Sequence, residues 1–292
     1  MFLGYSYIDI MINLVLALIM LGIGLSLTVN DFKNLFVHPK PLFLALGIQL
    51  FLVPTAAFII ASLSGLPDET KVGIVIVSLC ASGASSNLVT HLFKGNVALA
   101  ISMTTINSFI TLVSIPVMTN LALYIFLGVA REIHLSVPIT ILQIFIITLI
   151  PAAIGVFIRS KTGEWAVKLE KPVKVILVLM LGFIFTVKIF FGENFGGTGI
   201  TLKETLNLLP FMLLLNFTAM MLGFYIARVL KLDFKNQFTI SIEVGLHNTA
   251  LALLISGAIL NSPDMEKPAV VYAMFSFFTA IIFVLFIKKV YK

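Results

Sequence analysis

The sequence predicts an all-α integral membrane protein. Of its 292 residues, 60% are hydrophobic and only 11% are charged, whereas about 25% of the residues of a typical soluble domain are charged. Apolar stretches of about 20 residues, the length that crosses the hydrocarbon core as a helix, recur along the whole chain. The polar stretches between them are too short for a soluble domain, so we expect one membrane domain covering residues 1–292.

Nine apolar segments are predicted to be membrane-spanning helices. Each is long enough to cross the bilayer at a helical rise of about 1.5 Å per residue. An odd number of spans places the two termini on opposite sides of the membrane. The predicted spans are residues 7–29, 40–63, 72–94, 96–127, 135–160, 170–191, 205–230, 234–256 and 266–289.

The basic residues predict the orientation of these spans. With the N-terminus outside, fourteen of the nineteen Lys and Arg residues fall in cytoplasmic segments and five in outer ones, as the positive-inside rule requires. We therefore expect a multi-pass protein of the inner or plasma membrane with its C-terminus in the cytoplasm. The cytoplasmic set is Lys33, Lys40, Lys94, Arg159, Lys161, Lys168, Lys171, Lys174, Arg228, Lys231, Lys235, Lys288, Lys289 and Lys292. The outer segments are expected to hold Lys71, Arg131, Lys188, Lys203 and Lys267. The outer loops also carry the acids Asp68, Glu69, Glu132, Glu193, Asp264 and Glu266.

The remaining composition argues against other classes of protein. The net charge of +6 is explained by cytoplasmic loops, so no nucleic-acid partner is expected. The chain lacks the Gly-x-Ser-x-Gly and His-Glu-x-x-His motifs and any aspartate-rich prenyl-diphosphate motif, so we do not expect an enzyme. A single cysteine, Cys80, excludes an internal disulfide. A monomer in the lipid bilayer is the default expectation.

Two spans are interrupted by glycine and small polar residues around an asparagine. One contains the stretch 83–90, Gly-Ala-Ser-Ser-Asn-Leu-Val-Thr, and the other contains 245–250, Gly-Leu-His-Asn-Thr-Ala. They lie five spans apart, so they run in opposite directions, which is typical of inverted repeats with paired broken helices and a binding site at the membrane midplane. We predict a first repeat of four spans (1–130) and a second of five (131–292).

The most polar part of any span is the stretch 243–249, which contains Glu243, His247 and Asn248. A carboxylate at mid-bilayer costs at least about 2.5–3.5 kcal/mol, so we expect Glu243 to be functional and shielded from lipid. Ser and Thr side chains in spans also serve helix packing or bond their own backbone, and that structural role stays open for each hydroxyl. The other polar residues of the spans, as candidate partners, are Gln49, Ser85, Ser86, Asn87, Thr104, Asn107, Ser108 and Thr111.

These residue types indicate a site for a hard monovalent cation such as sodium. Where a helix breaks, main-chain carbonyls lose their partners and need protein, water or a cation. Carboxylate, amide, hydroxyl and carbonyl oxygens are the ligands that hard cations prefer. The set has too few acids for calcium or magnesium and lacks the His/Cys grouping of a zinc site.

Two motifs carry a resemblance to a known family. Residues 85–100 resemble the Ser-Asn-x-x-Thr and Gly-Asn-Val-Ala-Leu-Ser pattern of the bile acid:sodium symporter family, and residues 243–248 resemble its Glu-x-Gly-x-Gln-Asn motif. The resemblance covers most of the chain, from Gln49 to the C-terminus. It implies a nine-helix carrier that lacks the first helix of the ten-helix members. It also implies a panel of helices 7–29, 135–160 and 170–191, against which a core moves, formed by helices 40–63, 72–94, 96–127, 205–230, 234–256 and 266–289.

The resemblance also implies the site residues. The substrate is expected near the crossing of the broken helices. One sodium site is expected to use Ser86, Asn87, Thr104 and Glu243, and a second to use Gln49, Glu243 and carbonyls near Val244 and Leu246. The expected substrate-binding residues are Asn248, His247, Asn107 and Ser108.

Two positions depart from the family pattern. Ala100 stands where the pattern has a serine ligand, and His247 stands where it has glutamine. An imidazole offers no oxygen to sodium and titrates near neutral pH. We hypothesise that His247 either carries or senses a proton in place of one sodium, or donates a hydrogen bond to Glu243 or to the substrate while one sodium remains.

The leading functional prediction is therefore a cation-coupled secondary transporter. It carries an organic anion, such as a bile acid or a small carboxylate, by alternating access, with sodium as the coupling ion. The alternatives are a proton-coupled anion carrier that uses Glu243 and His247, and an uncoupled channel or sensor on the same scaffold. An intramembrane hydrolase is disfavoured, since only Ser86 with His247 is arguable as a nucleophile and base.

Overall fold

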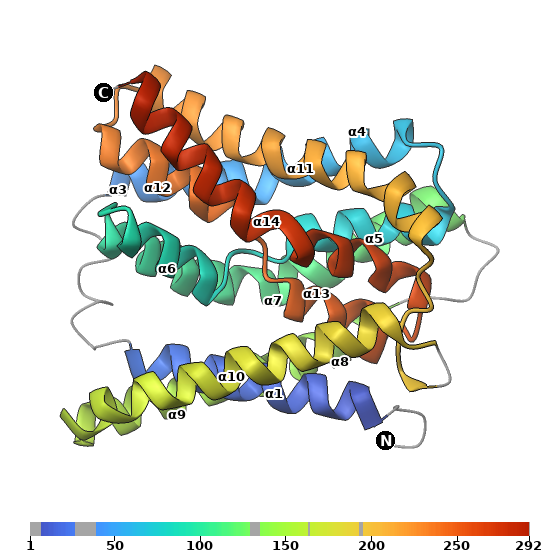
Figure 1. Cartoon of the computed structure of the whole chain (residues 1–292), viewed down its shortest axis with the longest axis horizontal. Helices are drawn as coiled ribbons and strands as arrows, with labels where there is room; N and C mark the ends of the chain where they lie inside the picture. Colours follow the sequence, from blue (N-terminus) through green and yellow to red (C-terminus); the bar gives the residue numbers. More distant parts are fainter. Residues whose placement is uncertain (1–6, 27–38, 129–134, 163, 193–194, 292) are drawn as a thin grey trace.

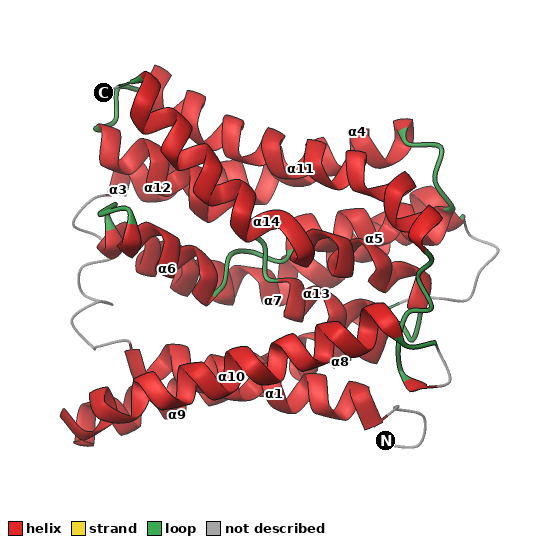
Figure 2. Ribbon diagram, in the orientation of Figure 1, coloured by secondary structure: helices red, strands yellow, loops and turns green. Residues whose placement is uncertain are grey.

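The computed structural model describes residues 7–26, 39–128, 135–162, 164–192 and 195–291 (Figure 1). Within these ranges the regular structure is entirely helical, and no strand occurs (Figure 2). The predicted all-α fold class is confirmed. Some of the charged residues assigned to a side of the membrane, and the last residues of the predicted span 7–29, lie outside the described ranges. These charged residues are Lys33, Arg131, Glu132, Glu193 and Lys292.

The helices follow the apolar segments closely. In the first half of the chain they are α1 (Tyr7–Ser26), α3 (Pro39–Gly47), η2 (Ile48–Leu52), α4 (Val53–Leu63), α5 (Asp68–Leu79), α6 (Ala84–Leu92) and α7 (Val97–Leu127). In the second half they are α8 (Val137–Ile144), η3 (Phe145–Leu149), α9 (Ile150–Thr162), α10 (Glu164–Phe190), α11 (Leu202–Val229), α12 (Phe234–Gly245), α13 (Thr249–Leu253), η5 (Leu254–Ile259) and α14 (Pro263–Val290). The η elements are short π-helical stretches that continue directly into their neighbours.

The chain is a multi-pass membrane protein. Within the described residues, six helical stretches are long and apolar enough to cross a bilayer: Pro39–Leu63, Val97–Leu127, Val137–Thr162, Leu202–Val229, Phe234–Ile259 and Pro263–Val290. The other three predicted spans correspond to α1, to α10 and to α5 together with α6. The total of nine spans stays a prediction.

The helix α5–α6 is interrupted, as is α12–α13. With 12 residues, α5 is only about 18 Å long and does not cross a hydrocarbon core of about 30 Å without α6. We expected the first interruption within residues 83–90, but it lies earlier, at Cys80–Gly83, because the polar residues from Ser85 onward form the first turns of α6. The second lies at Leu246–Asn248, within the predicted stretch.

The helices form two groups (Figure 1). The chain segments α1, α8–η3–α9 and α10, which we call the panel group, lie together along one side of the molecule. Gly24 of α1 and Gly155 of α9 allow close packing there, because a Cβ on Gly24 would lie 2.1 Å from the Ala152 carbonyl oxygen. The remaining helices, which we call the crossing group, contain both interrupted helices. The division into a panel and a core that moves against it stays a prediction.

Several charged residues expected in outer loops lie inside helices instead. Asp68 begins α5 and Asp264 lies in the first turn of α14, where a helix N-terminus favours negative charge. Lys188 lies in the last turn of α10, and Glu266 lies in the first turn of α14. These two side chains are buried against each other, so the loop prediction is wrong for Glu266. We call this end of the bundle, where α4, α7 and α10 finish, the outer end.

Candidate functional site

The two interrupted helices touch at their breaks. The backbone N–H of Asn248 donates hydrogen bonds to the carbonyl oxygens of Cys80, at 3.0 Å, and Ala81, at 3.2 Å. Figure 2 shows the two connecting loops crossing near the middle of the molecule. In a continuous helix this N–H would bond the carbonyl of Val244, so the crossing leaves that carbonyl without its helical donor.

Local sequence explains why the second helix breaks and restarts here. The Asn248 side chain caps α13, since its Oδ1 accepts a hydrogen bond from the Leu251 N–H at 3.1 Å. Asparagine is among the preferred N-cap residues. Gly245 lets α12 approach α11 closely, because a Cβ there would lie 2.2 Å from Cγ of Met220. The Gly245 carbonyl is bonded by two side chains, Asn216 Nδ2 at 2.8 Å and the Tyr272 hydroxyl at 2.5 Å.

Glu243 lies in the last turn of α12 with only 1% of its surface exposed. Its Oε2 accepts hydrogen bonds from the hydroxyl of Ser82 at 2.5 Å and from that of Thr104 at 3.3 Å. Its Oε1 is buried and has no hydrogen-bond partner among the described residues. A buried carboxylate oxygen left unpaired is costly, so the geometry suits a ligand that supplies positive charge at Oε1.

The residues predicted for the first sodium site surround this carboxylate. Asn87 donates from Nδ2 to the Thr104 hydroxyl at 3.3 Å, which links it to Glu243. The Asn87 Oδ1 is a second buried oxygen with no donor in the described part of the chain. Ser86 is fully buried, and its hydroxyl donates to the Gly83 carbonyl at 2.8 Å. The helices α6, α7 and α12 therefore bring the four predicted ligands together.

The residues predicted for the second sodium site are all buried. Gln49 lies in the π-helical stretch η2, a kind of local widening that is frequent at functional sites. Its Nε2 donates to the Ser78 carbonyl at 3.1 Å, and its Oε1 is unpaired within the described residues. No hydrogen bond joins Gln49 to Glu243 in the described structure. The backbone of Val244 and Leu246 borders the break itself.

His247 is buried next to the ring of Tyr272, with the ring centroids 5.3 Å apart. Neither Nδ1 nor Nε2 has a hydrogen-bond partner among the described residues. The hydrogen bond from His247 to Glu243 that we considered is therefore absent. The imidazole stands beside the crossing with both nitrogen atoms available to a ligand.

The predicted substrate residues on α7 divide into two kinds. The Ser108 hydroxyl donates to the Thr104 carbonyl at 2.8 Å, and the Thr111 hydroxyl donates to the Asn107 carbonyl at 2.8 Å, so both bond their own helix. Asn107 is 1% exposed, and its Oδ1 lacks a donor in the described part of the chain. Asn107 is thus better placed than Ser108 to bind a ligand through its side chain.

Three residues that sequence reasoning missed complete the site. Ser82 is the nearest hydroxyl partner of Glu243, but a lone serine in an apolar span looks like any packing residue. Asn216 and Tyr272 bond the Gly245 carbonyl and each other, at 2.9 Å. Asn216 carried a signal, since it is an isolated amide inside the apolar run 205–230.

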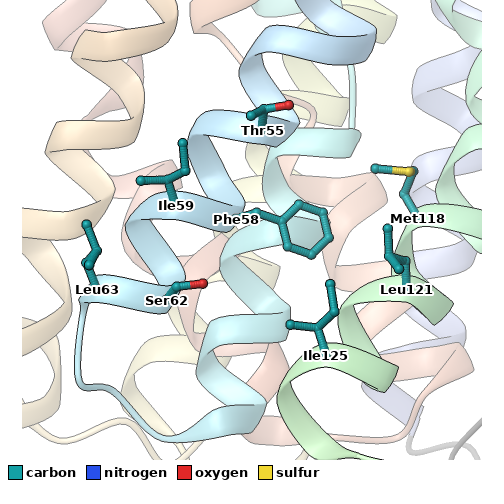
Figure 3. A pocket seen from close by; sticks show the side chains of 8 residues that line it. All are labelled: Thr55, Phe58, Ile59, Ser62, Leu63, Met118, Leu121 and Ile125. Atoms are coloured by element: carbon teal, nitrogen blue, oxygen red, sulfur yellow. The ribbon is translucent and has the colours of Figure 1, made fainter.

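A groove on the outer half of the molecule contains none of the predicted site residues (Figure 3). It has a volume of about 490 Å³ and lies between α4 and α7. Apart from two hydroxyl groups its lining is apolar, as expected of a surface that faces lipid. The lining residues are Thr55, Phe58, Ile59, Ser62, Leu63, Met118, Leu121 and Ile125.

Residues 13–196 match the Sodium Bile acid symporter family, which is more than half of the chain. The chain belongs to this family. The family consists of sodium-coupled transporters and not of enzymes, so the expectation that the chain is not an enzyme is confirmed.

Individual members of the family match over most of the chain. It is 30% identical over 92% of its length to the uncharacterized sodium-dependent transporter YocS of Bacillus subtilis, and 29% identical over 85% to the hepatic sodium/bile acid cotransporter of the rat. It is 28% identical over 88% to a chloroplastic protein of Arabidopsis thaliana named as a probable sodium/metabolite cotransporter, BASS1. The match covers 80% of YocS, 67% of the rat protein and 61% of the Arabidopsis protein.

Proposed function

We propose that this protein is a secondary active transporter that couples the movement of sodium to that of an organic anion by alternating access. The observation that carries the proposal is the buried Glu243 carboxylate at the helix crossing, with one oxygen hydrogen-bonded and the other unpaired. Several relatives are named as sodium-dependent transporters or sodium cotransporters, which supports the same choice of ion.

The first sodium ion is proposed to bind between Glu243, Asn87, Thr104 and Ser86. Glu243 Oε1 and Asn87 Oδ1 are buried acceptors without donors, and hard cations take such oxygens as ligands. Ser82 is added to this site, because its hydroxyl holds Oε2 and leaves Oε1 for the ion. Ala100 contributes no oxygen to this site.

A second sodium ion is proposed to use Gln49, Glu243 and the carbonyls of Val244 and Leu246. Two observations support it: the unpaired Gln49 Oε1 and the Val244 carbonyl, whose helical donor is bonded elsewhere. His247 opposes it, because an imidazole supplies no oxygen ligand. The proposal is therefore one strongly bound ion and a second that binds weakly.

The anion is proposed to bind on the other side of the crossing, at Asn248 and His247, with Asn107 and Ser108 of α7 completing the site. The N-termini of α6 and α13–η5 both begin at the crossing, and helix N-termini favour negative charge. A small carboxylate or a bile acid fits this chemistry. The metabolite and bile-acid substrates in the names of two relatives support this class.

Coupling follows from charge at the crossing. Without a cation, the negative Glu243 disfavours an anion nearby, and the Val244 carbonyl at the α12–α13 break lacks its helical donor. A bound sodium ion removes both penalties, so the anion binds more tightly to the sodium-loaded protein. The crossing group is then proposed to move against the panel group and to expose the site on the cytoplasmic side, with the N-terminus of the chain outside.

Thermal unfolding of the detergent-purified protein tests this function. Sodium is titrated against potassium at constant ionic strength, with wild type, Glu243→Gln and Glu204→Gln. A ligand that binds only the folded state stabilises it by about 2.7 kcal/mol at one hundred times its Kd. We expect a sodium-specific rise in Tm that is lost in Glu243→Gln. The matched control Glu204→Gln, which changes a carboxylate that is 43% exposed at the outer end, retains the rise.

Three outcomes would replace this proposal. Equal responses to sodium and potassium would remove sodium coupling. No sodium response, together with a stabilisation that depends on pH between about 5.5 and 8 and on Glu243, would indicate the proton-coupled carrier instead. Sodium flux through proteoliposomes in the absence of any anion would indicate an uncoupled channel.

A further inference from the structure

An ion pair lies buried between the panel group and the crossing group at the outer end. Lys188 Nζ of α10 lies 2.7 Å from Oε1 and 2.8 Å from Oε2 of Glu266 in α14. The two side chains are only 3% and 2% exposed. Both carboxylate oxygens therefore bond the same ammonium group in a dry contact between the two groups of helices.

Packing on both sides fixes this contact. A Cβ on Gly257 of η5 would lie 1.7 Å from Glu266 Oε1, so only glycine leaves room for the carboxylate in its present position. The backbone around Lys188 is held by Thr198, whose N–H and hydroxyl both donate to the Lys188 carbonyl, at 3.0 and 2.8 Å. Glu266 is therefore held by packing against Gly257, and Lys188 by the hydrogen bonds from Thr198.

Gly257, against which Glu266 packs, lies on the half-helix α13–η5, which begins at the proposed sodium and anion site. Asn248 caps α13, and α13 continues without a break into η5, which carries Gly257. The distance along this half-helix from Asn248 to Gly257 is about 14 Å at 1.5 Å per residue. A tilt or shift of α13–η5 at the crossing therefore changes the fit of Glu266 on Gly257.

The energetics of a buried ion pair make this contact bistable. Moving one charge away while the other remains buried is strongly unfavourable. The contact has two stable arrangements: both charges paired and dry, or both separated and hydrated. Intermediate arrangements are disfavoured, which is the behaviour of a two-state contact in a conformational change.

We propose that Lys188 and Glu266, seated by Gly257, form a latch that closes the outer end and opens when the panel group separates from the crossing group. This inference rests on the proposed alternating access. It assigns to Glu266 a positioning role, since this side chain holds two groups of helices and does not contact the ions or the anion. The half-helix α13–η5 is the physical link between the latch and the site.

Distances between spin labels test the latch. Phe190 at the end of α10 and Leu63 at the end of α4 are 77% and 81% exposed, so a cysteine at each position accepts a label on each side of the contact. Cys80 is fully buried and is expected to stay unlabelled. Pulsed electron paramagnetic resonance on the detergent-purified, full-length protein then gives the distribution of distances across the outer end.

The variants are chosen to break the latch from either side. In wild type we expect one main distance, with the outer-open form a minor state of about 0.1–10%. In Glu266→Gln and in Gly257→Ala the longer distance is expected to rise roughly tenfold or more in relative population. The matched control is Gly182→Ala in α10, because a Cβ at Gly182 meets no atom within 4 Å, and its distribution is expected to equal that of wild type.

A variant with the two charges exchanged distinguishes opening of the latch from a general loss of folding. Lys188→Glu combined with Glu266→Lys keeps an ion pair, and we expect it to shift the distribution back toward the short distance relative to Glu266→Gln. Wild-type distances in both Glu266→Gln and Gly257→Ala would overturn the latch. If Glu266→Gln does not fold, Gly257→Ala and the reversed pair decide the question in the same way.

The labels are measured in sodium and in potassium, so failure of the latch and failure of the proposed function are distinguishable. A sodium response of Tm without any change of distances in the latch variants retains the function and rejects the latch. Longer distances in the latch variants without a sodium response of Tm retain the latch and reject sodium coupling.

Discussion

Removing one partner of the buried Lys188–Glu266 pair is expected to destabilise the protein far more than removing both. Lys188→Met removes the ammonium group that bonds both oxygens of a carboxylate with 2% exposure. Breaking a buried pair in this way costs about 3–5 kcal/mol. Replacing both residues by methionine removes both charges and roughly keeps the volume, and such replacements of buried pairs are often neutral or stabilising by about 1–4 kcal/mol.

A neighbouring pair provides the control for this prediction. Lys267 Nζ lies 2.7 Å from Glu204 Oε1, but the Glu204 side chain is 43% exposed. Ion pairs that reach solvent contribute only about 0–1 kcal/mol, and Lys267 keeps a second partner, Asp264 Oδ1 at 2.6 Å. Glu204→Gln is therefore expected to change stability little. The measurement is the free energy of unfolding by denaturant in detergent for the four members of the Lys188/Glu266 cycle and for Glu204→Gln. The reasoning is refuted if Lys188→Met costs no more than Glu204→Gln, or if the double variant is less stable than either single one.

Three further predictions address the site and its supports. Ser82→Ala frees Oε2 of the carboxylate from its shortest hydrogen bond, so the Kd for sodium is expected to rise several-fold in a binding titration, whereas an unchanged Kd would remove Ser82 from the site. His247→Gln supplies an amide oxygen and is expected to bind sodium more tightly with an unaltered pH profile. If sodium binding by the wild type depends on pH and this dependence is lost in His247→Gln, the result would indicate proton coupling. Gly24→Ala is expected to lower Tm, because its Cβ would lie 2.1 Å from the Ala152 carbonyl oxygen, whereas Gly47→Ala, with nothing within 4 Å, is not.

The stretch 243–249 is the part of the candidate site that the sequence predicts most directly. An acid and an asparagine inside an apolar run have no inexpensive structural explanation in lipid, and both lie at the crossing. The break in the other interrupted helix, α5–α6, was predicted too late in the sequence, because the small polar residues after Gly83 are typical of an interruption. They form α6 instead, and the Ser86 hydroxyl bonds the carbonyl of Gly83 at the start of that helix.

Contacts between residues of distant spans could not be predicted from the sequence. Ser82 reaches Glu243 across 161 residues of sequence, and Lys188 reaches Glu266 across 78. Each of these residues looks ordinary in its own segment: a serine in an apolar run, and charges at the ends of apolar runs. Only the packing of α5–α6 on α12, and of α10 on α14, gives them partners. Local composition predicts which residues tolerate lipid, and tertiary packing decides which polar groups meet.

Direct binding of radiolabelled sodium to the purified protein tests the central claim most directly. Wild type, Glu243→Gln and the control Glu204→Gln are equilibrated with the labelled ion at constant ionic strength, with unlabelled sodium or potassium as competitor. We predict saturable binding in wild type and in Glu204→Gln that sodium but not potassium displaces, and loss of that binding in Glu243→Gln. Equal binding by Glu243→Gln and wild type, or no saturable binding by wild type, would contradict a sodium site at the helix crossing.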